Sequence, residues 1–157
     1  VAGPYRTVLA AVDLSSHSLA AVRKAAQLVP GGNVSIVYAA HRPFNAFLSR
    51  ASQDQMVRSQ HSAFAADIGA FTKQLAGELG DAVPEFTFIM TEGEIENVMR
   101  RLVEEQKPDL IAVGTHGRAA FAQAIIGSLA ESLLAETPCD VLAVKATLAA
   151  AQDENYP

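Results

Sequence analysis

Cysteine and basic residues are scarce in this chain, and long hydrophobic runs are missing. Cys139 is the single cysteine, so no disulfide can form within the chain, and a reducing, cytoplasmic location is expected. Lys plus Arg number 12 against 17 Asp plus Glu, which gives a formal charge of −5. Because nucleic acids are bound by clustered positive charge, no nucleic-acid partner is expected. No apolar stretch is long enough to cross a bilayer, so no membrane insertion is expected.

Two common phosphate-binding motifs are also missing. The sequence has no G-x-x-x-x-G-K-[ST] segment and no G-x-G-x-x-G after the first expected strand. Their absence disfavours a P-loop nucleotidase and a dinucleotide-dependent dehydrogenase. The amino end, VAGPYRTVLAAVDL, has one Arg and a short apolar run that soon meets Asp13. We expect neither a secretory signal nor a membrane anchor there.

Hydrophobic residues make up 50% of the 157 positions, which is enough for one core. One domain is expected over residues 1–148, followed by a short polar tail over residues 149–157. Apolar runs alternate with helical patterns, which is typical of an α/β protein with a parallel sheet. The expected strands are Thr7–Val12, Val34–Ala39, Phe86–Met90, Leu110–Val113 and Val141–Val144.

Four helical patterns lie between and after these strands. The first is capped by Ser15 or Ser16 and ends before Pro30. The second has an apolar stripe that favours packing on the sheet over a coiled coil. That stripe consists of Val57, His61, Phe64, Ile68, Phe71, Leu75 and Leu79. The third covers Ile95–Leu102, with acidic residues near its start, and the fourth begins near Gly127. Residues 41–60 lack a clean period and are predicted to form a long loop, either covering a site or making a surface excursion.

The segment GTHGRAAFAQAIIGS, residues 114–128, has glycines spaced as G-x-x-G, nine residues, then G-S. In a doubly wound sheet, ligands bind beyond the carboxyl ends of the strands where the winding direction reverses, and this predicts a site at Asp13 and Gly114. Glycine at 114 and 117 would allow close backbone approach and positive φ. Gly127 and Ser128 stand at a helix start, which attracts anions. Each feature alone is explained by a turn or a cap, but together they favour a phosphate site.

The chain resembles the universal stress proteins of the UspA-like, ATP-binding type from Tyr5 to Lys145. The resemblance rests on TVLAAVDLSSHS, LIAVGTHGR, the GS of IIGSLAESLL, TPCDVLAVK and the full glycine spacing. It implies a single doubly wound α/β domain with helices on both faces of a five-stranded parallel sheet, in the order 3-2-1-4-5. It also implies a homodimer through the fifth strand, which would cover that exposed edge.

The resemblance further implies an adenine-nucleotide site that takes ATP and Mg²⁺. Ala11, Val12 and Asp13 would line the adenine and ribose, and Ala39 would meet the adenine edge with its backbone. Asp13 has two readings. It either caps the helix that follows or accepts a hydrogen bond from the nucleotide or from water on Mg²⁺, which would make it the metal-site residue.

At the other end of the implied site, the ribose and first phosphates would follow Val113, Gly114 and Gly117. The outer phosphates would be held by Gly127, Ser128 and Leu129. Arg118 would either add positive charge beside the phosphates or point to water.

The predicted function is a nucleotide-dependent signalling or binding module in a stress response, with an unknown protein partner. A slow ATPase and a dimeric scaffold that no longer binds nucleotide are the alternatives. Catalysis is weakly supported because the loop has no phosphate-binding lysine and no evident group to orient water. The run Asp13, Ser15, Ser16 and His17 is interpreted as helix capping rather than a catalytic set. A phospho-receiver is disfavoured because Thr91 follows the third strand where an aspartate would be needed.

Overall fold

A computed structural model describes residues 4–13, 15–42, 45–115 and 128–145 of the chain. Its five strands are β1 (Thr7–Ala11), β2 (Asn33–Ala40), β3 (Glu85–Glu92), β4 (Leu110–Gly114) and β5 (Asp140–Val144). They form one sheet in the order β3-β2-β1-β4-β5, and every pairing is parallel. This confirms the predicted α/β fold class and strand order.

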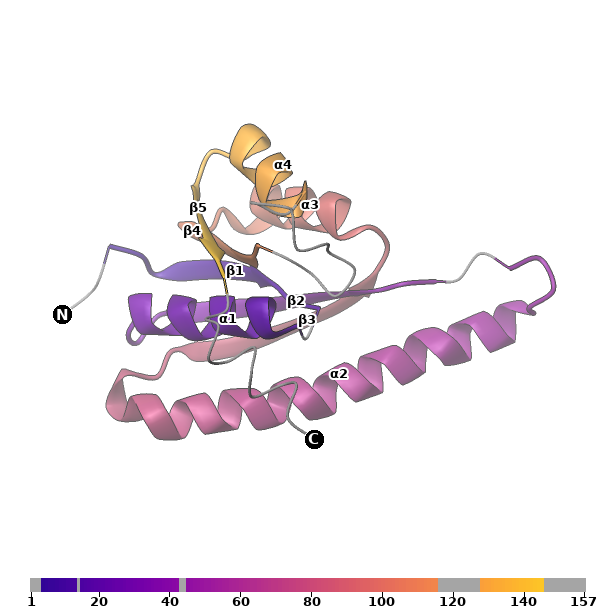
Figure 1. Ribbon diagram of the computed structural model, residues 1–157, viewed down its shortest axis with the longest axis horizontal. Coiled ribbons are helices and arrows are strands. Elements are labelled where there is room, and N and C mark those ends of the chain that lie inside the picture. Colours follow the sequence, from indigo (N-terminus) through magenta and orange to yellow (C-terminus); the bar gives the residue numbers. More distant parts are fainter. Residues whose placement is uncertain (1–3, 14, 43–44, 116–127, 146–157) are drawn as a thin grey trace.

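The helices cover both faces of the sheet (Figure 1). The α-helices are α1 (Ser16–Leu28), α2 (Arg50–Leu79), α3 (Ile95–Gln106) and α4 (Ser128–Glu136), and a short 3₁₀ turn, η1 (Gly80–Ala82), follows α2. Helices α1 and α2 lie on one face, and α3 and α4 lie on the other (Figure 1). Within the described part of the chain, no helix is both long enough and apolar enough to span a membrane.

The side chains of β1 over residues 8–11 are buried on both faces of the sheet. Successive side chains of a strand point to opposite faces. Val8 and Ala10 pack with α1 and α2, while Leu9 and Ala11 pack with α3 and α4. All four are buried, so the continuous apolar run in the sequence is that of a central parallel strand.

Helix α1 begins and ends where the sequence indicates. Ser15 is the N-cap, and its side chain accepts a hydrogen bond from the Ser18 backbone N–H at 3.2 Å. The chain leaves the helix through Pro30 and Gly31, whose φ of 71° favours glycine. The cap prediction is therefore confirmed for Ser15, and Ser16 is the first helical residue.

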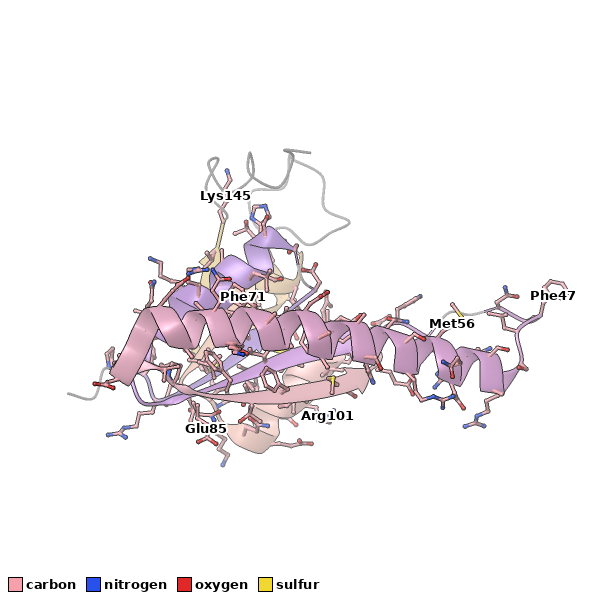
Figure 2. All side chains as sticks on the ribbon, turned by 90° about the horizontal axis from the view of Figure 1, so that it is seen from below. Phe47, Met56, Phe71, Glu85, Arg101 and Lys145 are labelled. Atoms are coloured by element: carbon pink, nitrogen blue, oxygen red, sulfur yellow. The ribbon has the colours of Figure 1, made fainter. Side chains whose placement is uncertain are left out.

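The prediction of a loop over residues 41–60 is wrong in its second part, because α2 already begins at Arg50. Ser49 is the N-cap, and its side chain accepts from the Ser52 N–H at 3.1 Å. The first turns of α2 project past the sheet, with Phe47 and Met56 at the projecting end (Figure 2). Val57 is the first buried residue of α2. The sequence shows no apolar period before it because these turns bury no side chain against the sheet.

The apolar stripe of α2 otherwise packs as predicted. Phe64, Ile68 and Leu75 are buried in the core cluster beneath β1 and β2. Tyr38 of β2 stacks on Phe64 with ring centroids 4.5 Å apart. Packing on the sheet, rather than a coiled coil, accounts for this stripe.

Candidate functional site

The candidate site lies at the carboxyl ends of β1, β2 and β4, where the winding of the sheet reverses. Strands β2 and β3 extend to one side of β1, and β4 and β5 extend to the other. Because Ala10 pairs with Ala112, Ala11 lies beside Val113. The Val12 N–H donates to the Val37 carbonyl at 2.9 Å. The structure thus brings the predicted site residues Ala11, Val12 and Val113 together at one edge of the sheet.

Most of these residues offer backbone rather than side chain. Ala11 is 6% exposed, Val12 is 4% exposed and Val113 is 1% exposed, and their side chains belong to the core. Ala39 is half-buried at the end of β2. A ligand at this edge would therefore meet mainly peptide N–H and C=O groups, which are strong hydrogen-bonding partners.

Asp13 shapes the turn from β1 into α1. Its Oδ1 accepts from the Ser15 N–H at 2.9 Å, and its own N–H donates to Ser18 Oγ at 3.3 Å. Asp13 therefore fixes the turn that precedes α1, while Ser15 is the residue that caps the helix. A carboxylate held in this way has a fixed orientation at the strand end.

Gly114 has a packing role that the sequence did not predict. Its φ lies outside the left-handed region, because it is simply the last residue of β4. A Cβ at this position would lie 2.7 Å from both the His17 carbonyl carbon and the Ser18 nitrogen. The prediction of positive φ at Gly114 is wrong, and the glycine instead lets the end of β4 pack against the amino end of α1.

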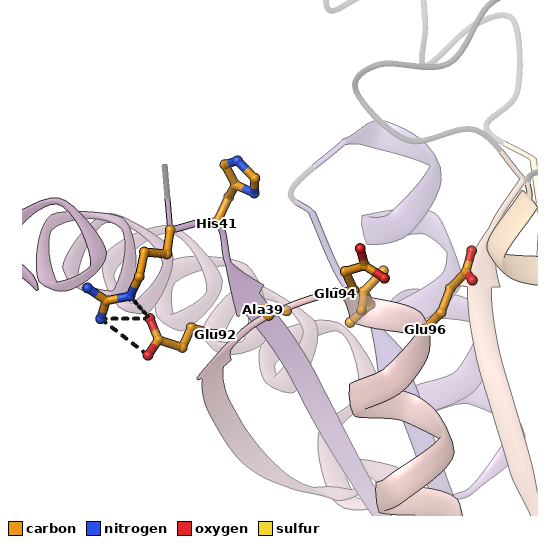
Figure 3. Close-up of a pocket in the computed structure, with 8 residues that line it drawn as sticks. Ala39, His41, Glu92, Glu94 and Glu96 are labelled. Carbon is orange, nitrogen blue, oxygen red and sulfur yellow. Dashed lines mark hydrogen bonds and ion pairs between the residues drawn. The ribbon is translucent and has the colours of Figure 1, made fainter. Parts of the chain in front are cut away.

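A hollow of about 780 Å³ opens beside Ala39, at the ends of β2 and β3 and the start of α3 (Figure 3). It is lined by Ala39, His41, Arg42, Glu92, Gly93, Glu94, Ile95 and Glu96. Figure 3 shows Glu94 and Glu96 on one side of Ala39 and Glu92, the ion-pair partner of Arg42, on the other. Apart from Ala39, these residues were not predicted as site residues. The strand order 3-2-1 was the available signal, since it places the end of β3 next to that of β2.

Arg42 is the cation of this hollow, and its charge is already matched. Its Nε and Nη2 donate to the two carboxylate oxygens of Glu92 at 3.0 and 3.2 Å, and its Nη1 donates to Asp54 at 2.8 Å. The hydrogen bond that Arg42 donates to Glu92, followed by the one it donates to Asp54, raises the pKa of Arg42 above its ordinary value. Arg42 therefore joins α2 to the end of β3 and stays charged.

Comparison with known proteins decides the family. A model of the universal stress protein family matches residues 4–145. The chain belongs to this family. Its relatives include a universal stress protein of Thermus aquaticus named for its place in a QAH/OAS sulfhydrylase 3′ region, which is 28% identical over 143 residues. That match covers 90% of this chain and 99% of the relative.

Solved universal stress proteins share the fold at lower identity. UspA from Lactobacillus plantarum matches with a TM-score of 0.73 and 20% identity, covering 89% of this chain and 97% of that one. A universal stress protein in complex with cAMP matches with a TM-score of 0.60 and 22% identity, covering 94% and 100%. A family protein from Arabidopsis thaliana with AMP bound matches with a TM-score of 0.57 and 12% identity, covering 92% and 94%.

The residues predicted to bind phosphate in this universal stress protein are described only in part. Gly117, Arg118 and Gly127 lie outside the described residues, as does the predicted tail over residues 149–157. Ser128 is the first residue of α4, and Leu129 packs against the core cluster on the α3 and α4 face. Among the residues that the structure describes, no three His, Cys, Asp or Glu side chains gather closely enough to hold a metal ion.

Proposed function

We propose that this universal stress protein binds an adenine nucleotide, ATP with Mg²⁺, at the carboxyl edge of its sheet and acts as a nucleotide-dependent binding module. The carrying observation is the convergence of the ends of β1, β2 and β4 at the winding reversal, directly before the G-x-x-G, nine, G-S segment. Binding of cAMP and AMP by two proteins of the same fold supports an adenine ligand.

At the base end, the proposal assigns recognition to the backbone. The side chains of Ala11 and Val12 are committed to the core, so their peptide groups and that of Ala39 would meet the adenine and ribose. Asp13 would accept a hydrogen bond from the ribose or from a water on Mg²⁺, because its position is fixed by the Ser15 N–H. One carboxylate is sufficient for Mg²⁺, which takes its other ligands from phosphate and water.

At the phosphate end, the proposal places the ribose and first phosphates along Val113, Gly114 and Gly117, and the outer phosphates at Gly127, Ser128 and Leu129, with Arg118 nearby. The start of a helix attracts anions through its unpaired N–H groups and dipole. Helix α4 is fixed for this role, because Arg100 of α3 donates to Ser132 Oγ at 3.2 Å and pairs with Glu136.

A signalling role requires a surface that differs between the occupied and empty states. Residues 50–60 are already helical, so nucleotide binding would act through the connection from β4 to α4 rather than by ordering this stretch. A partner protein would read that surface. A homodimer through β5 would present two copies of it and would cover the edge of the sheet.

Calorimetric titration with ATP and Mg²⁺ tests the proposal, together with chromatography of any nucleotide released when the purified protein is denatured. Wild-type protein should bind ATP, and Gly127→Val should bind at least about tenfold more weakly, because a side chain there would block phosphate approach. Gly77→Ala is the matched control, since its added Cβ meets nothing within 4 Å.

Folding of each variant is checked by circular dichroism. A folded Gly127→Val protein that binds ATP as tightly as wild type would contradict the phosphate assignment. Wild-type protein that neither retains nucleotide nor releases heat would contradict nucleotide binding and would favour the scaffold alternative. Steady phosphate release that depends on Asp13 and Ser128 would favour the slow ATPase.

A further inference from the structure

Two consecutive residues of α2, Gln60 and His61, hold the ends of the two strands beside the hollow. The Gln60 side chain bonds both backbone groups of His41: its Oε1 accepts from the His41 N–H at 2.9 Å, and its Nε2 donates to the His41 carbonyl at 2.8 Å. His61 Nε2 donates to the Thr91 carbonyl at 2.8 Å. Thr91 pairs with Ala39 in the sheet register.

The Gln60 side-chain amide hydrogen-bonds the backbone of His41, the residue after β2, as a neighbouring strand would. Strand β2 ends at Ala40, and His41 lies just beyond it. A side-chain amide has one acceptor and one donor group, so it can satisfy one backbone N–H and one C=O at the same time. The extended backbone that starts in β2 is thereby fixed beyond the last sheet bond.

Gln60 is itself held in position by its neighbours. The Tyr38 hydroxyl donates to Gln60 Oε1 at 3.5 Å, and the Tyr38 ring stacks on Phe64, one turn further along α2. On the other side, Arg42 ties the segment after His41 to Asp54 of α2 and to Glu92 at the end of β3. The backbone from Ala39 to Arg42 is therefore fixed from α2 over successive turns.

We infer that Gln60 is a positioning residue for nucleotide recognition, which fixes the Ala39–His41 backbone against which the base binds. This inference rests on the proposed function. Backbone groups select a base only when they are held in the geometry that matches its edge. Because Gln60 lies on α2 and acts through His41, it influences the base end of the ligand and not the phosphates.

The substitution Gln60→Met tests this role, because it keeps the length of the side chain and removes both hydrogen bonds to His41 together with the one from Tyr38. Amide hydrogen exchange of His41 should become at least about tenfold faster in the variant. Affinity for ATP and for adenosine should fall by the same factor, about tenfold, as expected for lost hydrogen bonds that fix a binding surface. The ratio of the affinity for ATP to the affinity for GTP should be smaller in the variant than in wild type.

Gln74→Met is the matched control, since Gln74 lies on the same helix and bonds only Glu78 among the described contacts. It should leave the exchange of His41, both affinities and the ATP-to-GTP ratio unchanged. An equal loss for adenosine and ATP distinguishes a base-end effect from weakened phosphate binding, which would spare adenosine.

The outcomes separate this inference from the function on which it rests. Wild-type protein that binds no nucleotide overturns both. Wild-type protein that binds ATP, with Gln60→Met binding as tightly and as selectively, overturns only the role of Gln60. A loss seen with ATP but not with adenosine also overturns it, because the effect would then lie at the phosphates.

Discussion

Gly114 has a packing role that its place in the sequence does not indicate. The sequence places it between a strand and a glycine-rich segment, which suggested ligand approach. The structure places the amino end of α1 against it, with two backbone atoms 2.7 Å from the position of a Cβ. A contact between elements nearly a hundred positions apart cannot be read from local spacing.

The substitution Gly114→Ala should destabilise the protein. The two nearest atoms are backbone atoms of His17 and Ser18, and His17 Cβ lies 2.8 Å away, so none of them can move aside as the far end of a flexible side chain would. Overpacking of this kind costs about 1–3 kcal/mol. Urea denaturation of wild type, Gly114→Ala and Gly77→Ala would measure it. Equal midpoints for wild type and Gly114→Ala would refute the packing argument.

Because of Asp109, the free energy of unfolding should depend on pH in the acid range. It joins the start of β4 to β1, accepting from the Arg6 N–H at 2.7 Å and the Thr7 N–H at 3.1 Å. The backbone hydrogen bonds from Arg6 and then Thr7 lower its pKa below the ordinary value of 3.8. The unfolded chain therefore binds more protons between the two pKa values, and stability falls as the pH falls through this window.

The substitution Asp109→Asn should remove that acid dependence. The variant should be less stable than wild type at neutral pH because the amide oxygen accepts the same N–H groups without a charge. Below the lowered pKa the stabilities of the two proteins should converge. Urea midpoints from about pH 6 to about pH 3 would check this, and parallel curves over the whole range would count against the assignment.

At the scale of elements, burial decides what the sequence predicts. Strands β1, β2 and β4 could be predicted from their continuous apolar runs, and helices α1 and α3 from apolar side chains at helical spacing. The start of α2 could not be, since its first turns lie past the sheet and carry no buried side chain before Val57. The hollow beside Ala39 was also missed, because its residues come from two stretches, 39–42 and 92–96, that meet only in the folded chain.

The stability of the first turns of α2 should depend on the N-cap Ser49. Ser49→Ala removes the hydrogen bond to the Ser52 N–H, which is worth about 1 kcal/mol in typical helices. Amide exchange should accelerate at Ser52 and Gln53 while the buried part of the helix around Ile68 stays protected. Ser62→Ala, at an exposed position within the same helix, serves as the control. Uniform acceleration along α2 would show that the helix opens as one unit instead.

At the scale of the whole molecule, the order of the strands locates the candidate site. A parallel sheet wound both ways from β1 leaves the ends of β1 and β4 side by side without a covering crossover. The resemblance to the universal stress proteins implied this order, and the sequence supplied the residues at each strand end. The glycine spacing then predicts a phosphate site at the same edge. The packing of Gly114 against α1 and the hydrogen bonds between Gln60 and His41 could not be predicted, because they exist only in the folded arrangement.

Mapping of amide chemical shifts during titration with ATP and Mg²⁺ tests the central claim most directly. Our account predicts the largest changes at residues 12–13, 39–41 and 113–115 and at the start of α4, with little change at η1 and the carboxyl end of α2. Saturable changes confined to another surface, or no changes at millimolar ATP, would contradict it.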